Sequence, residues 1–83
     1  MRARACNLAG MTVDVAAIKQ RIGERVLQFR EAAGLTQALL AEKANMSETY
    51  VCLIENGHCN PSLEKLCELA RALAVEFEDL TKA

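Results

Sequence analysis

The stretch GLTQALLAEKANMSETYVCLIENG, residues 34–57, decides how this chain folds. It contains two short apolar segments, and each follows a hydroxyl side chain, Thr36 or Ser47, of the kind that caps the N-terminus of a helix. Asn45 can take the left-handed conformation that closes the first helix, so only about three residues separate the two. Because so short a connection forces a large crossing angle, residues 36–56 are predicted to form a helix-turn-helix whose second helix protrudes from the surface.

Apolar residues recur at helical spacing on both sides of this pair. The stripe before it, which predicts a helix ending at Gly34, is Val15, Ile18, Ile22, Val26 and Phe29. The face after it, which predicts a helix capped by Ser62, is Leu63, Leu66, Leu69, Ala70 and Leu73. A last short turn holds Phe77 and Leu80. The sequence therefore predicts an all-α fold, a compact bundle of five helices.

The length of 83 residues allows one small domain, and a hydrophobic content of 52% is enough to give it a core. We expect a flexible N-terminal arm over residues 1–11, which carries Arg2 and Arg4, and a folded domain over residues 12–83. No apolar run approaches the roughly 20 residues that cross a bilayer, and the first residues lack the apolar stretch of a secretory signal. We therefore expect a cytoplasmic protein with no membrane partner.

The net charge of −1 hides a gradient along the chain. Residues 1–35 have a formal charge of +3, and residues 36–83 have a formal charge of −4. A strongly basic protein that binds nucleic acid would have a different composition. Composition alone therefore argues mildly against that class of function.

From Ile22 to Leu80 the chain resembles the Cro/C1-type helix-turn-helix family of phage and bacterial repressors, also called the Xre family. The resemblance rests on the segments IGERVLQFREAAGLTQALLAEKANMS, VCLIENG and NPSLEKLCELARALAV, in the order and spacing of the family. It implies a lambda-repressor-like bundle and a transcriptional regulator that binds double-stranded DNA. The Thr49–Val51 stretch is also similar to controller proteins of restriction-modification systems, which often carry arginine where this chain has Glu48.

The resemblance gives the base-reading role to the helix that follows Ser47, which would lie in the major groove. A carboxylate accepts a hydrogen bond from cytosine N4, a hydroxyl can donate or accept, and a leucine can touch only a thymine methyl group. The base-reading residues that the resemblance implies are Glu48, Thr49, Tyr50 and Leu53. For Glu48 a simpler interpretation stays open, namely that it compensates the dipole at the helix N-terminus.

The resemblance also implies residues that hold the DNA backbone and the reading helix. Phosphate contacts are implied for Gln37, Ser47, Asn56, His58, Asn60 and Lys65. Arg30 and Glu55 match a pair that meets between the first and third helices of the family, which predicts a partly buried ion pair. The alternatives are that Gln37 is only a polar residue at a helix start and that Arg30 and Glu55 are unrelated, solvated charges.

One copy reads too few base pairs for useful specificity, and the family binds a palindromic operator as a symmetric dimer with half-sites about 34 Å apart. We therefore expect a homodimer. Its interface is expected at Val75, Phe77 and Leu80, because so short a final element cannot by itself hide these apolar side chains. The alternative is that all three lie in the core of one copy.

Three of the four cysteines and the single histidine invite a metal-sensor hypothesis for Cys52, His58, Cys59 and Cys67. Their spacings match no common zinc pattern, so we expect free thiols, no metal and no cofactor. Cys67 is expected in the core beside Leu66 and Leu69.

An enzyme is not expected, since His58 has no evident carboxylate to orient it, no glycine-rich phosphate loop occurs, and the domain has no room for a sizeable pocket beside its core. The stronger rival is a protein-interaction module, similar to an antitoxin or adaptor domain, that uses the same helix-turn-helix surface. An acidic residue on the reading helix, Glu48, fits that alternative. The charge of the face around Gln37, Asn56 and Asn60 discriminates between the two.

Overall fold

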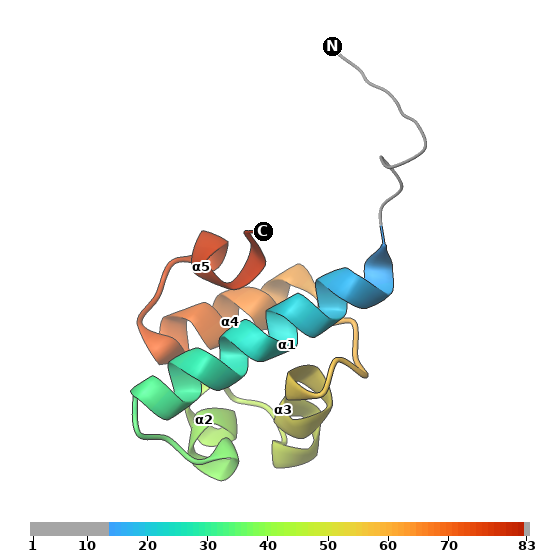
Figure 1. Ribbon diagram of the computed structural model, residues 1–83. Helices are drawn as coiled ribbons and strands as arrows, with labels where there is room; N and C mark the ends of the chain where they lie inside the picture. Colours follow the sequence, from blue (N-terminus) through green and yellow to red (C-terminus); the bar gives the residue numbers. More distant parts are fainter. Residues whose placement is uncertain (1–13, 83) are drawn as a thin grey trace.

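Five helices follow one another along residues 14–82, the part of the chain that this computed structural model describes (Figure 1). They are α1 (Val15–Ala32), α2 (Gln37–Lys43), α3 (Glu48–Glu55), α4 (Leu63–Leu73) and α5 (Phe77–Thr81). Within residues 14–82 there is no strand, and the predicted all-α fold is confirmed. The expected arm, with Arg2 and Arg4, lies outside the described residues.

The helix boundaries follow local signals in the sequence. Asp14, Thr36, Ser47 and Ser62 each accept a hydrogen bond from the backbone N–H three residues further on, at 3.0 to 3.3 Å. Helix α1 ends where Gly34 takes a φ of +73° and the N–H of Leu35 turns back to the carbonyl of Arg30 at 3.1 Å. The capping residues of the helix-turn-helix are therefore those expected from residues 34–57.

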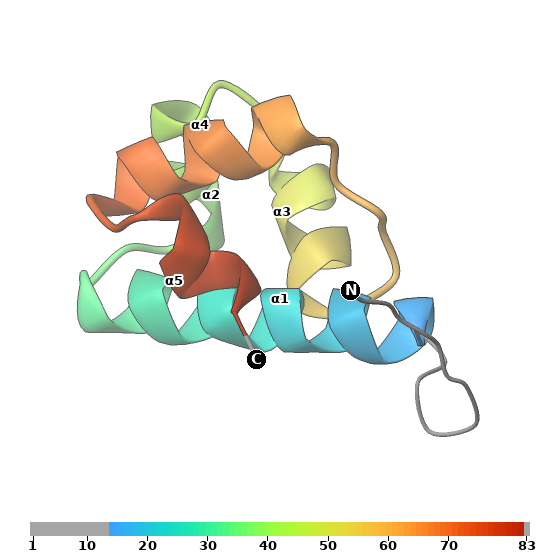
Figure 2. The same ribbon diagram turned by 90° about the horizontal axis from the view of Figure 1, so that it is seen from above.

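The other three helices lie on two opposite sides of the pair formed by α1 and α4 (Figure 1). Seen from above in Figure 2, α1 and α4 lie on opposite sides, with α2 and α3 between them. Figure 1 shows α5 on one side of the α1 and α4 pair and the helix-turn-helix of α2 and α3 on the other. Helix α3 packs against both α1 and α2, and α5 packs against both α1 and α4. None of the helices in residues 14–82 has the length and apolar character needed to cross a membrane.

The core lies where these helices meet. Its largest fully buried side chains are Val26, Leu40, Val51, Ile54, Leu69 and Leu80. Two residues expected on the apolar faces are exposed instead, Val15 and Leu63, the latter to 71%. Each is the first residue of its helix, in a turn that precedes the first core residue of that helix, Ile22 or Leu66.

The expected dimer interface needs a correction at Leu80. Its side chain is fully buried inside one copy, because α5 folds back across α1 and α4. Arg25 Nη1 donates to the carbonyl of Asp79 at 2.9 Å, which ties α5 to α1, and the Glu76 N–H donates to Asp79 Oδ2 at 3.0 Å in the capping box that starts α5. Val75 and Phe77 are half-buried and pack against the same core. Leu80 therefore belongs to the core and cannot contact a second copy.

Candidate nucleic-acid interface

Helix α3 has one buried face and one open face. Val51 and Ile54 are buried in the core, while Glu48 and Thr49 in the first turn are exposed. Leu53, one turn after Thr49, is 39% exposed. Three of the four residues expected to read bases, Glu48, Thr49 and Leu53, therefore lie on the open side of the helix.

Tyr50 does not share this position. Its ring is half-buried and packs against the core, next to Cys59 in the loop that follows α3. Burial raises the pKa of the Tyr50 hydroxyl above its usual value of 10.0, and the adjacent Cys59 thiol raises it further. The tyrosine therefore packs between α3 and the loop after it while part of its side chain stays exposed, and its base-reading role stays a prediction.

The C-terminal end of α3 is fixed by a network around Glu55. Arg30 Nε donates to Glu55 Oε2 at 2.6 Å, and Arg30 Nη2 donates to Glu55 Oε1 at 3.2 Å. Arg30 Nη1 donates to the Leu35 carbonyl at 2.8 Å, and Gln37 Nε2 donates to Glu55 Oε1 at 2.8 Å. Hydrogen bonding to Glu55 raises the pKa of Arg30, and only 13% of the Arg30 side chain and 4% of the Glu55 side chain are exposed. This end of α3 is therefore joined to both α1 and α2.

Gly23 also helps to position the C-terminal end of α3, although the sequence pattern predicted no role for it. A Cβ atom placed on Gly23 would lie 2.3 Å from the carbonyl oxygen of Ile54 and 2.8 Å from that of Glu55. Helix α1 can approach the backbone of α3 only because residue 23 has no side chain. The available signal was a glycine in the middle of a helical stripe, where glycine costs roughly 1 kcal/mol relative to alanine.

Four of the six residues expected to bind phosphate also make hydrogen bonds within the protein. Ser47 accepts from the Tyr50 N–H at 3.0 Å and keeps its own hydroxyl hydrogen, and Gln37 keeps one amide hydrogen after bonding Glu55. Lys65 pairs with Glu68 at 3.4 Å and retains free N–H groups. Asn56 directs its amide nitrogen at the Cys52 carbonyl and Sγ, at 2.9 and 3.4 Å. The other two, His58 and Asn60, are exposed in the loop between α3 and α4.

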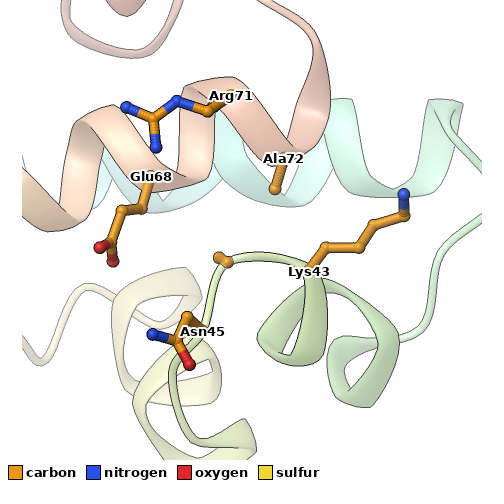
Figure 3. A pocket seen from close by; sticks show the side chains of 6 residues that line it. Lys43, Asn45, Glu68, Arg71 and Ala72 are labelled. Atoms are coloured by element: carbon orange, nitrogen blue, oxygen red, sulfur yellow. The ribbon is translucent and has the colours of Figure 1, made fainter.

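The exposed charge of α2 and α3 is weakly negative. Glu42, Lys43 and Glu48 are all exposed. Lys43 lines an open cleft of about 460 Å³ between the α2–α3 turn and α4, together with Arg71, Glu68 and Asn45 (Figure 3). Electrostatic attraction to phosphate is therefore weaker on this surface than on a strongly basic DNA-binding surface.

The three cysteines of residues 14–82 do not gather into a site. Cys52 and Cys59 are half-buried free thiols, and Cys67 is exposed. The expected core position of Cys67 is wrong, because the turn of α4 places it outside the arc formed by Leu66 and Leu69. Within residues 14–82 no group of three His, Cys, Asp or Glu side chains is placed to hold a metal ion.

Comparison with known proteins finds the same arrangement among helix-turn-helix proteins. The helix-turn-helix family HTH_3 matches residues 26–80. The immunity repressor protein of Bacillus phage phi105 is 44% identical over 55 residues, which are 66% of this chain but only 38% of that repressor. The crystal structure of the restriction-modification controller protein C.AhdI from Aeromonas hydrophila has a TM-score of 0.75 and 36% identity, over 77% of this chain and 97% of that one. SinR, a master regulator for biofilm formation solved in complex with DNA, has a TM-score of 0.67 and 37% identity, over 71% of this chain and 95% of that one.

Proposed function

The chain belongs to the Cro/C1-type (Xre) helix-turn-helix family, a family of DNA-binding transcriptional regulators and not of enzymes, and we propose that it binds a palindromic operator as a homodimer. Residues 12–83 would act as one DNA-binding unit, in the cytoplasm. The observation that carries the proposal is the position of α3, whose N-terminal half is open while its C-terminal end is anchored. The likeness to SinR, which was solved with DNA, supports the same use of this surface.

In this proposal α3 enters the major groove with Glu48, Thr49 and Leu53 toward the bases. The hydroxyl of Ser47 and the free amide hydrogen of Gln37 would donate to phosphates on either side of the groove, with Lys65, His58 and Asn60 near the start of α4. The network of Arg30, Glu55 and Gln37 would keep α3 in register, because these side chains tie its far end to α1 and α2.

For the homodimer we keep Val75 and Phe77 as candidate interface residues, since both are only half-buried in one copy. Sedimentation velocity measures the mass of the free protein and of its complex with a duplex. A palindromic duplex that takes up two copies supports the dimer, whereas one copy per duplex at saturation contradicts it.

Fluorescence anisotropy with labelled DNA tests the proposal directly. The duplexes are the promoter region of the protein's own gene and a scrambled sequence of equal length, each at low and at physiological salt. We expect tighter binding to the promoter duplex, weakened by Thr49→Ala and unaffected by Cys67→Ala, a control on the exposed face of α4. Equal binding to both duplexes that vanishes at physiological salt would be non-specific electrostatics and would count against sequence reading.

A second candidate function is a protein-interaction module that uses the same surface. The observation in its favour is the weakly negative exposed charge of α2 and α3, together with two exposed leucines, Leu39 at 46% and Leu53 at 39%. Failure to bind either duplex at physiological salt would favour this candidate.

A further inference from the structure

The open face of α3 lacks the side chains that proteins use to read purines. Guanine is usually read by an arginine or lysine that donates to O6 and N7, and adenine by an asparagine or glutamine amide. Helix α3 itself contains no arginine or lysine, and Arg30, which meets its C-terminal end, uses Nε, Nη1 and Nη2 to donate within the protein. Gln37 and Asn56 each have an amide nitrogen bonded within the protein, to Glu55 and Cys52, and neither residue lies within α3.

The side chains that do face outward match pyrimidines. Glu48 is a carboxylate, which accepts from the N4 amino group of cytosine but is repelled by the N7 acceptor beside the amino group of adenine. Leu53 offers only a hydrocarbon surface, and the C5-methyl of thymine is the apolar group in the major groove. Thr49 can add its own methyl group to that contact.

The spacing of Thr49 and Leu53 fits bases about two steps apart. Thr49 and Leu53 are four residues apart, so they form one ridge and are separated by about 6 Å along the helix axis. Stacked bases on one strand are about 3.4 Å apart. The two side chains can therefore contact bases about two steps apart on the same strand.

We propose that α3 reads its operator through pyrimidine groups, with Leu53 on the C5-methyl of a thymine and Glu48 on the N4 amino group of a cytosine. The proposal rests on the function proposed above and specifies what the same surface recognises. One consequence concerns DNA methylation, because 5-methylcytosine presents its methyl group where thymine does. A methyl group at the position read by Leu53 would strengthen binding to cytosine there.

The test begins with selection of tight-binding duplexes from a random pool by the purified full chain. In the enriched duplex each thymine is replaced in turn by uracil, which removes the C5-methyl and keeps the base pair. Dissociation constants are measured by anisotropy at physiological salt for the parent protein, for Leu53→Ala and for Leu63→Ala. Leu63 is a matched control because it is an exposed leucine, at 71%, on α4.

We expect one thymine in each half-site at which uracil weakens binding about fourfold, the value of one buried methyl group. This loss should persist in Leu63→Ala and disappear in Leu53→Ala. At the same position, 5-methylcytosine should bind about fourfold more tightly than cytosine.

Three results would overturn the inference. The first is that no uracil substitution changes the affinity, and the second is that the uracil effect is the same in Leu53→Ala as in the parent protein. The third is an enriched duplex whose binding depends on guanine N7, shown by substitution with 7-deazaguanine, and on no methyl group. If selection enriches no sequence, the proposed function itself fails. If a sequence is enriched but one of the three results above is found, only the inference fails.

Discussion

The two ends of α3 are built from opposite kinds of contact. At the C-terminal end, Glu55 accepts hydrogen bonds from Arg30 and Gln37 and is almost wholly buried, and Gly23 lets α1 touch the backbone. At the N-terminal end, Glu48 and Thr49 are exposed and their side chains make no hydrogen bond to another group in residues 14–82. A helix that reads another molecule must leave its contacting groups unpaired, so its position has to be fixed elsewhere.

The largest effect expected from this comparison is the loss of the Glu55 carboxylate. Glu55→Ala leaves Arg30 buried without its partner, which should lower the free energy of unfolding by about 3 to 5 kcal/mol. Urea denaturation followed by circular dichroism measures it. Glu68→Ala is the matched control, because its pair with Lys65 is partly exposed and should contribute under about 1 kcal/mol. Equal losses in the two variants would contradict the anchoring role of Glu55.

A smaller loss is expected from Gly23→Ala. Alanine is normally the better helix residue, but here its Cβ would displace the carbonyls of Ile54 and Glu55, so the free energy of unfolding should fall by about 1 to 3 kcal/mol. The same denaturation measurement applies. Gly34→Ala is a useful comparison, since its cost comes only from the positive φ, with no atom nearby to clash. A gain in stability for Gly23→Ala would show that α1 and α3 are not in close contact.

Substitutions at the exposed N-terminal end of α3 should change DNA binding and leave the free energy of unfolding nearly unchanged. Glu48→Gln replaces an acceptor by a group that also donates, so the preference for cytosine over the other bases should fall roughly tenfold. Its effect on the free energy of unfolding should stay within about 0.5 kcal/mol. Glu64→Gln is the matched control in the first turn of α4. If both variants lose only the same small stability and leave DNA binding unchanged, Glu48 does no more than compensate the helix dipole.

The smallest effect concerns Tyr50, which lies between the two ends. Burial favours the neutral phenol, so its pKa is higher in the folded protein than in the unfolded chain. Its contribution to stability is complete below about pH 10 and is lost as the pH rises through the folded pKa. The free energy of unfolding should therefore fall more for the parent protein than for Tyr50→Phe between neutral pH and about pH 11. Identical pH profiles would mean that the hydroxyl is solvated.

Much of the fold could be predicted because its signals are local. Thr36, Ser47 and Ser62 cap helices by contacts within a few residues, and the apolar spacing depends only on the pitch of the helix. The exposure of Cys67 and Leu63 was harder to predict, because it depends on which part of α4 a neighbouring helix covers. The contact between Arg30 and Glu55 was predicted from the family resemblance, because two residues 25 positions apart give no local signal that they meet.

The sequence by itself determined the helices, their caps, the short turn and the type of side chain on α3. Only the tertiary structure decided that Tyr50 turns toward the loop and that Leu80 belongs to one copy's core. It likewise decided that Gly23 is the contact point of α1 and α3. The physical reason is range, since capping and periodicity act within one or two helical turns, whereas burial and close approach depend on segments distant in the chain.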